Sequence, residues 1–246
     1  MMILTGKTII SALRPPYPYG GELVNQFLFA LRLCWFPLLV STVAFGYGAP
    51  GLQAGNFLTI FGAIDRLGGF FVLASIREFA PFVTAIIVSG VAGTAICADL
   101  GARKIREELD ALQVLGVDPV KNLVVPRFLA LMVITGLFNV YALLFGIFGG
   151  VIATLTFDAP LGPFFTTLLT NASIPDLWGS VVKTTSFGAI IAIISCYKGM
   201  TASGGAEGVG RAVNQAVVAT ITVVFAFNYV FTQVLLATNP EISVIK

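Results

Sequence analysis

Long apolar runs alternate with short polar breaks along the chain, and together they predict five membrane-spanning helices. About 20 apolar residues cross the hydrocarbon core of a bilayer. The candidate spans are residues 33–47, 79–100, 123–155, 177–197 and 213–237. The first run is short and contains Pro37, so it needs residues from the preceding segment. The pattern predicts an all-α integral membrane protein with five transmembrane helices.

The 32 residues before the first span are amphipathic rather than uniformly apolar. A proline-rich break over residues 14–19 precedes residues 22–32, in which Leu23, Phe27 and Leu31 share one helical face. Such a helix lies in the plane of the membrane surface. We therefore expect an N-terminal interfacial segment over residues 1–32, the alternative being a frayed extension. Residues 52–76 are expected to form a partly embedded connector, and residues 156–176 a loop.

The longest charged passage lies between the second and third spans, at residues 99–119. Its charged residues cluster between positions 103 and 110: Arg103, Lys104, Arg106, Glu107, Glu108 and Asp110. Among them, Ile105, Leu109 and Leu112 recur at helical spacing. Gly116 follows in the position of a C-terminal cap, and Pro119 prevents continuation of the helix. We predict an amphipathic helix over about residues 103–115, either a loop helix or a docking surface.

Composition agrees with the membrane assignment and excludes several classes of function. The chain of 246 residues is 57% hydrophobic and 11% charged, against about 25% charged residues in soluble domains. A net charge of +2 and the lack of a basic patch argue against nucleic-acid binding. The chain contains no histidine, and Cys34, Cys97 and Cys196 are far apart in apolar runs. We expect three buried thiols, no metal site and no removable signal peptide.

Lysine and arginine favour one orientation in the membrane. Basic residues gather in cytoplasmic segments of membrane proteins. With the N-terminus inside, those segments hold most of the basic residues of the chain: Lys7, Arg14, Arg32, Arg103, Lys104, Arg106, Lys121, Arg127, Lys198 and Arg211. The outer connections hold Arg66 and Lys246, with Arg77 and Lys183 at membrane borders. We expect a cytoplasmic N-terminus, an extracytoplasmic C-terminus and a cytoplasmic 99–119 stretch.

The glycine-rich residues 205–212 do not form a nucleotide-binding loop. A phosphate-binding loop requires Lys followed by Ser or Thr, whereas this chain has Arg211 and Ala212. We predict a tight glycine loop in which Glu207 and Arg211 pair across one helical turn. The sequence also lacks a nucleophile–base pair or paired carboxylates. We therefore do not expect an enzyme or a cofactor in this chain, and any ATP hydrolysis must come from another one.

Three charged residues lie at or inside the predicted spans: Arg77, Glu78 and Lys183. Charges in a membrane are costly and often functional, but each could also extend to the headgroups. Glu78 precedes Pro81 by three positions, which favours a role in fixing the entry to the second span.

Motifs distributed over residues 22–238 together resemble the MlaE/YrbE permease family. They are Glu78-x-x-Pro81, Gly90-x-x-Gly93-Thr94-Ala95-Ile96, Asp99-Leu100-Gly101, Glu107-Glu108-Leu109-Asp110-Ala111-Leu112, Gly116-x-Asp118-Pro119, Leu123-Val124-x-Pro126-Arg127 and Gly204-Gly205-x-Glu207-Gly208-Val209-Gly210-Arg211. The resemblance implies a permease domain over residues 33–238 and a short tail over residues 239–246. It implies the membrane subunit of an ATP-driven lipid transporter in the inner (plasma) membrane. A non-transporting scaffold that anchors partners remains the alternative.

The resemblance also implies partners and site residues. The expected partners are a second permease, two copies of a cytoplasmic ABC ATPase that bind ATP and Mg²⁺, and six MCE proteins outside. The coupling helix would present Arg103, Arg106, Glu107, Glu108, Asp110, Ala111 and Leu112 to the ATPase. Structural or gating roles would fall to Glu78, Pro81, Gly90, Gly93, Glu207 and Arg211.

Two departures from many Gram-negative members indicate a branch of the family. Val91 stands where those members have arginine, and Asp99 where they often have glutamate. Both resemble the actinobacterial YrbE branch of the Mce lipid-import systems, and within it an A-type subunit that pairs with a B-type partner. The expected cargo is a hydrophobic lipid of the sterol or the fatty or mycolic acid class.

Overall fold

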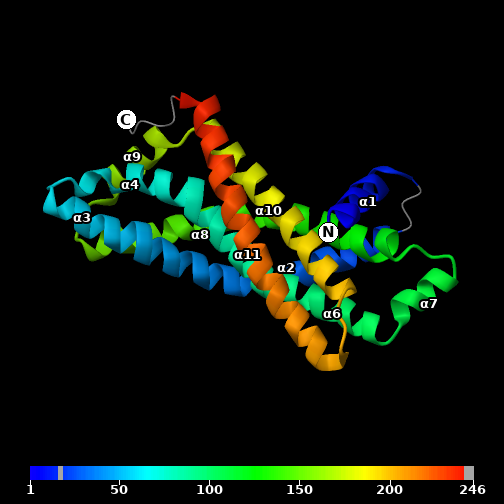
Figure 1. Ribbon diagram of the computed structural model, residues 1–246. Coiled ribbons are helices and arrows are strands. Elements are labelled where there is room, and N and C mark those ends of the chain that lie inside the picture. The colour runs from blue at the N-terminus through cyan, green and yellow to red at the C-terminus, as the bar shows by residue number, and fades with distance from the viewer. Residues whose placement is uncertain (16–18, 241–246) are drawn as a thin grey trace. The chain divides into compact units, whose positions relative to one another are not determined.

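The computed structural model describes residues 1–15 and 19–240, and the part of the chain that it describes is helical with no strand (Figure 1). The expected break at residues 14–19 and the tail over 239–246 fall partly outside those residues. Five helical runs are long and apolar enough to cross a membrane. A short helix α1 (Met2–Leu13) precedes them. The predicted fold class, all-α with five membrane-spanning helices and a separate N-terminal helix, is confirmed.

The first two runs are assembled from short helical segments that follow one another directly. Run one comprises α2 (Gly20–Gly46), the π-helical η1 (Tyr47–Gln53) and α3 (Ala54–Ile60). Run two comprises η2 (Ile64–Arg66), α4 (Leu67–Phe71), η3 (Val72–Phe79), α5 (Ala80–Val88), η4 (Ser89–Gly93) and α6 (Thr94–Ile105). Residues 22–32 are thus the first turns of α2 and not a separate interfacial helix, because α2 continues from Gly20 through Pro37 to Gly46.

The remaining runs follow a short helix, α7 (Glu108–Val114). They are η5 (Val120–Val124) with α8 (Val125–Thr156), then α10 (Ile174–Met200) and α11 (Gly205–Thr238). Two expected loops are helical. Residues 156–176 contain α9 (Leu161–Asn171), and the predicted glycine loop is the start of α11. Only Gly204 and Gly205 keep positive φ values there, of 89° and 68°.

The chain divides into two compact units, each described here by itself. Unit 1 consists of Met1–Cys34, Ala85–Thr135 and Thr185–Ala226. Small residues let its helices approach closely. A Cβ atom added at Gly93 would lie 3.0 Å from Oγ of Ser195, and one at Gly188 would clash with the Leu131 carbonyl. The three cysteines lie in this unit, free and buried, as predicted.

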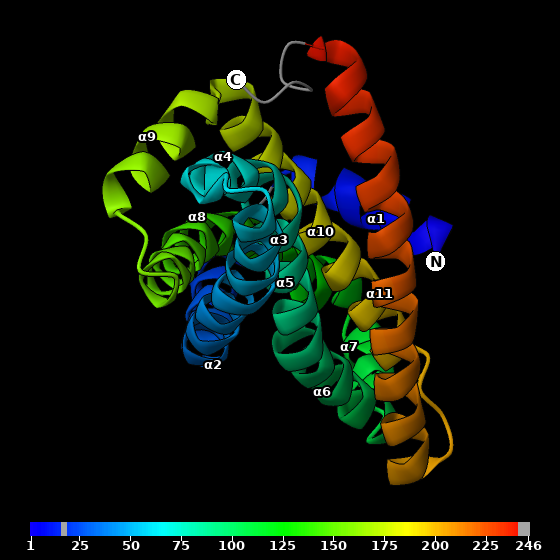
Figure 2. The same ribbon diagram turned by 90° about the vertical axis from the view of Figure 1, so that its left-hand side faces the viewer.

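Unit 2 consists of Trp35–Thr84, Gly136–Thr184 and the described part of Phe227–Lys246. Its apolar core gathers around α4 and α9, which lie side by side in Figure 2. The rings of Phe71 and Phe164 meet edge to face with centroids 5.9 Å apart. Gly68 touches the backbone of α9 so closely that a Cβ atom would clash with the Phe164 carbonyl. The connector predicted over residues 52–76 is therefore part of the packed core of unit 2.

Candidate functional site

The charged stretch between the second and third runs forms a helix–turn–helix element in unit 1. Helix α6 ends at Ile105, and Glu107 adopts a left-handed backbone conformation with φ of 60° before α7 begins at Glu108. The single helix predicted over residues 103–115 is therefore two helices. The backbone of Glu107 alone accounts for the break, because a residue with positive φ cannot continue a right-handed helix.

Gly116 ends α7 as the sequence predicted. Its φ is 78°, and its N–H donates to the Gln113 carbonyl at 3.0 Å. The Val117 N–H donates to the Leu112 carbonyl at 2.9 Å. These two bonds form the pattern with which a left-handed glycine commonly closes a helix. The short helix is thus fixed at its C-terminal end by its own sequence.

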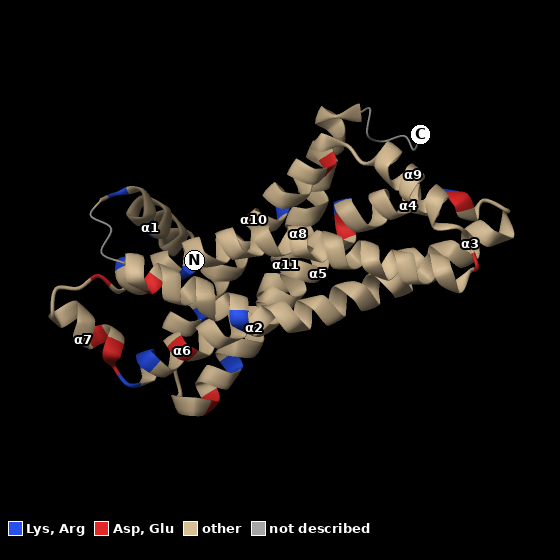
Figure 3. Ribbon diagram, turned by 180° about the vertical axis from the view of Figure 1, so that it is seen from behind, with Lys and Arg blue, Asp and Glu red and all other residues tan. Residues whose placement is uncertain are grey.

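Acidic and basic residues gather around this turn (Figure 3), and ion pairs connect its two sides. Lys104 lies 2.9 Å from Asp110, and Arg106 lies 2.7 Å from Glu108. The hydrogen bond to the Glu108 carboxylate, followed by the attraction of its charge, raises the pKa of the Arg106 guanidinium. All four side chains are substantially exposed, so the pairs contribute little stability. They orient α7 on α6, and they leave Glu107 and Asp110 on the surface.

The apolar residues of α7 divide into a buried and an exposed set. Leu109 is only 3% exposed and belongs to the core of its own chain, whereas Leu112 is half-buried. Val114 and Leu115 are 88% and 76% exposed. Leu109 of the predicted apolar stripe is therefore not available to a partner, because its side chain is already packed within the chain. A partner would meet Ala111, Leu112, Val114 and Leu115.

Helix α1 is tied to the segment that follows α7. The Lys7 ammonium lies 3.1 Å from the Asp118 carboxylate, and both side chains are partly exposed. Oδ1 of Asp118 also accepts from the Val120 N–H at 2.9 Å, at the start of η5. Thr8 of α1 is fully buried beside this contact. The N-terminal helix therefore packs against the end of the charged element through one ion pair and a small buried face.

Unit 2 contains a polar cluster of Glu78, Lys183, Asn228 and Thr232, of which Lys183 is buried and the other three are partly exposed. The Lys183 ammonium lies 3.3 Å from Oε1 of Glu78 and donates to the Thr232 hydroxyl at 2.8 Å and to the Arg77 carbonyl at 2.7 Å. The Glu78 carboxylate also accepts from Asn228 at 2.7 Å and from Thr232 at 2.8 Å. Lys183 is 1% exposed. One ion pair and several hydrogen bonds thus connect three helical segments of unit 2: η3, α10 and α11.

A second buried ion pair lies at the start of α10. Nε of Arg77 donates to Asp176 at 2.6 Å, and the Asp176 side chain is fully buried. The Ser173 hydroxyl donates to Asp176 at 2.6 Å and accepts from its N–H at 3.3 Å. Ser173 is therefore the N-cap of α10, since its hydroxyl accepts from the N–H of the third helical residue.

Sequence reasoning found the charges of unit 2 but not their partners. Lys183 does not extend to the headgroups, since it is buried against Glu78. Glu78 lies well inside the run Ile64–Ile105, so it does not mark the entry to a helix. Asp176, Asn228 and Thr232 were not singled out. Polar side chains in apolar helices commonly bond across helices, and that signal could have identified Asn228 and Thr232.

The other predicted motif residues do not form one site. Pro81 is buried in the first turn of α5 in unit 2, and Gly93 is packed in unit 1. Gly90 faces open space, with nothing within 4 Å of an added Cβ atom. Glu207 and Arg211 pair at 2.6 Å across one turn of α11, as predicted, and both are exposed. Among the described residues, no three His, Cys, Asp or Glu side chains are placed to hold a metal.

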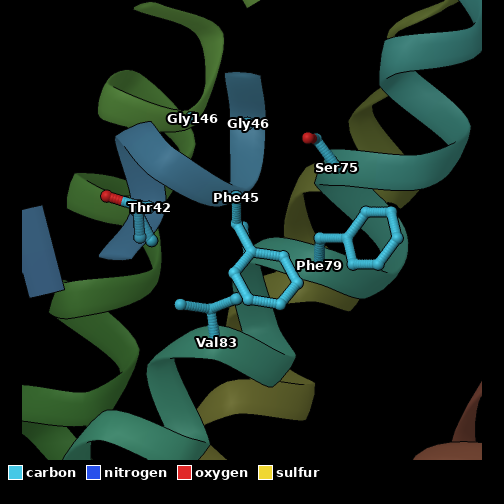
Figure 4. Close-up of a pocket in the computed structure, with 9 residues that line it drawn as sticks. Thr42, Phe45, Gly46, Ser75, Phe79, Val83 and Gly146 are labelled. Carbon is cyan, nitrogen blue, oxygen red and sulfur yellow. The ribbon is translucent and has the colours of Figure 1, made fainter. Parts of the chain in front are cut away.

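A small pocket in unit 2 lies between α2, the η3–α5 segment and α8 (Figure 4). Phe45, Phe79 and Val83 line it, together with the hydroxyl-bearing Thr42 and Ser75. Its volume is about 10 Å³, which is close to the minimum for one water molecule. This pocket does not have the volume of a lipid site.

Five apolar helical runs, joined by short connections that include an exposed charged turn, define a polytopic membrane protein. The family model of the MlaE permease matches residues 23–234. The chain belongs to the MlaE permease family, whose members are the membrane subunits of ABC transporters and so work with an ATPase.

Proteins of similar sequence support the assignment to this family. A probable ABC transporter permease protein of Rickettsia typhi is 32% identical over 92% of this chain and 87% of its own length. A probable ABC transporter permease protein of Synechocystis is 36% identical over 72% of this chain and 68% of its own length. The chloroplast protein TRIGALACTOSYLDIACYLGLYCEROL 1 of Arabidopsis thaliana is 34% identical over 70% of this chain and 49% of its own length.

Proposed function

We propose that the chain is the permease subunit of an ATP-driven MCE-type transporter that moves hydrophobic lipid across the inner (plasma) membrane, in the direction of import. The observation that carries the proposal is α7, a short exposed helix that joins two membrane-spanning runs. It combines surface carboxylates at Glu107 and Asp110 with exposed Val114 and Leu115. Such a helix can seat in a groove of a partner, and the partner of an ABC permease is its ATPase.

Motion would pass from the ATPase to the spans through rigid contacts. Lys104 and Arg106 of the α6 end are paired with carboxylates of α7, and α6 continues directly into the second run. Displacing α7 would therefore displace α6 as one body, the kind of movement by which helices transmit a switch. ATP and Mg²⁺ would bind on the ATPase. Gly93, packed closely on α10, would transmit the shift within unit 1.

The finer assignment rests on sequence resemblance. Val91 and Asp99 support the actinobacterial YrbE branch and an A-type subunit paired with a B-type permease, with six MCE proteins on the outer side. The basic residues of α1 and the α6–α7 turn support a cytoplasmic N-terminus and an extracytoplasmic C-terminus. Sterols or fatty and mycolic acids are the proposed lipids. The Arabidopsis relative is named after a glycolipid, and this name supports lipid as the class of cargo.

The test is co-purification of the ATPase with permease variants, followed by lipid transport after reconstitution. We expect Val114→Asp and Leu115→Asp to abolish both, because a carboxylate cannot be buried in an apolar contact without a partner. Leu13→Asp on α1 is the matched control: Leu13 is 73% exposed and lies outside the proposed contact. Unchanged ATPase binding by both α7 variants would contradict the assignment of α7.

Charge reversal tests the acidic half of the same surface. Glu108→Lys with Asp110→Lys should abolish ATPase co-purification and transport. These changes also break the pairs with Arg106 and Lys104, so Lys104→Gln with Arg106→Gln serves as the control for the loss of those pairs. A scaffold that transports nothing would bind the ATPase and yet show no lipid-stimulated ATP hydrolysis in the reconstituted complex.

A further inference from the structure

A second pocket lies in unit 1 between α2, α6 and α8, with a volume of about 350 Å³. One side is apolar and consists of Phe29, Ala95 and Ile96. The other side carries Asp99, Arg103 and Arg127. The pocket shares no lining residue with α7 or with the charged cluster of unit 2.

Arg127 is buried in the wall of this pocket. Its residue is 2% exposed, and its Nη2 donates to Asp99 at 2.6 Å while Nη1 donates to the Leu123 carbonyl at 2.8 Å. Nε of Arg127 is buried and has no hydrogen-bond partner among the described residues. Buried guanidinium groups are costly unless their charge and their donors are satisfied. The guanidinium of Arg127 therefore has one N–H donor for which no acceptor is found among the described residues.

The charges around the pocket do not balance. Asp99 is the shared acceptor of both arginines, since Nε of Arg103 also donates to it at 3.1 Å. The carboxylate of Glu108 is 3.9 Å from Arg103 but only 2.7 Å from Arg106, so Arg106 already engages it. Gln26 of the lining also donates to Glu22 at 2.8 Å. Among the residues that line the pocket, two guanidinium groups share one carboxylate, so the lining itself carries one positive charge in excess.

We propose that this pocket binds the oxyanion headgroup of a singly charged amphiphile, a carboxylate or a phosphate diester at the end of a lipid. Arginine suits such a group because its donors match two oxygens at once. The first carbons of the lipid would lie on Phe29 and Ile96. Leu33, one turn beyond Phe29 on α2 and 38% exposed, extends the apolar surface for the chain. The inference deepens the proposed function and rests on it for the choice of a lipid as ligand.

The test is lipid retention by the purified full-length protein in neutral detergent, measured by native mass spectrometry and titration. The probes are oleate, phosphatidylglycerol, phosphatidylcholine and sodium phosphate. We expect oleate and phosphatidylglycerol to bind more tightly than phosphatidylcholine. Arg127→Gln and Arg103→Gln should each weaken anionic lipid binding about tenfold or more, as expected for a lost charged hydrogen bond.

Arg66→Gln is the matched control, since Arg66 is an exposed arginine of η2 and does not line the pocket. It should leave lipid binding within about twofold of the unmodified protein. Arg103 is about one-third exposed, so Arg103→Gln decides the question if Arg127→Gln does not fold. Wild-type affinity in Arg103→Gln would overturn the proposal. Sodium phosphate binding as tightly as phosphatidylglycerol would overturn the assignment of an amphiphile.

Binding and transport are measured separately, so the two proposals fail separately. If the reconstituted complex moves no lipid while the arginine variants lose anionic lipid binding, the pocket stands and the proposed function fails. If transport proceeds and the variants bind anionic lipid normally, the pocket fails and the proposed function stands.

Discussion

The ammonium nitrogen of Lys183 lies 3.3 Å from Oε1 of Glu78, inside an apolar unit and 105 residues away along the chain. The lysine is 1% exposed, whereas the Glu78 side chain is 36% exposed. The carboxylate also holds Asn228 and Thr232 of α11. One acidic residue therefore compensates a buried cation and links three helical segments.

Removing the carboxylate should be more harmful than removing the whole pair. Glu78→Gln leaves the buried Lys183 without its counter-ion, and we expect a loss of about 3 kcal/mol in the free energy of unfolding. Adding Lys183→Met should recover most of that loss, because the uncompensated charge is gone. Thermal or denaturant unfolding in detergent measures both. Lys198→Met is the control, because the Lys198 ammonium donates to the neutral side chain of Gln215. Additive effects of Glu78→Gln and Lys183→Met would contradict the pairing.

Replacing glycine by alanine should change the stability of the protein differently at Gly116 and at Gly90. Gly116 has φ of 78°, so Gly116→Ala should cost about 1–2 kcal/mol and expose the amides of α7 to hydrogen exchange. Gly90 is helical and faces open space, so Gly90→Ala should be neutral or stabilising by up to about 1 kcal/mol. Hydrogen exchange by mass spectrometry and unfolding measurements check both. Equal destabilisation by the two changes would contradict the left-handed cap.

The buried cysteines make the sidedness of the chain easy to test. Cys34, Cys97 and Cys196 are buried, so the unmodified protein should react little with a membrane-impermeant maleimide. Leu115→Cys should be labelled only from the cytoplasmic side, and Ile60→Cys, at a residue 80% exposed on α3, only from the outer side. Oriented vesicles provide the measurement. Labelling of both variants from the same side would refute the proposed orientation.

The start of α10 should depend on its capping pair. Ser173→Ala removes the N-cap hydroxyl, and we expect a loss of about 1 kcal/mol in stability. Asp176→Asn also removes the charge that faces Arg77 at 2.6 Å, so its loss should be larger. Unfolding midpoints in detergent compare the two. Thr170→Ala is the control, because its exposed hydroxyl bonds only within α9; a similar loss there would show that the effect is unspecific.

Several features followed from local sequence alone. The apolar runs predicted the five spans, because helix satisfies every backbone hydrogen bond within the segment and lipid offers no alternative. Gly116 predicted the end of α7, and the four-residue spacing of Glu207 and Arg211 predicted their pair. The cysteine positions predicted buried free thiols. All of these depend on neighbours within one or two turns.

Other features followed only from the tertiary structure. Leu109 is buried and Leu115 is exposed, because six positions along a helix place two side chains on different faces, and only the packing of α7 shows which face is covered. The helix α9 was read as a loop, since its stability comes from packing on α4 through Gly68 and Phe164.

The sequence by itself determined the number of spans, the charged stretch between the second and third, and the family. Only the tertiary structure decided which carboxylate meets which cation. Glu78 and Lys183, like Asp99 and Arg127, come together because close packing at small residues brings distant helices into register. That packing sums many weak contacts across long separations in the chain, and no local pattern of residues contains it.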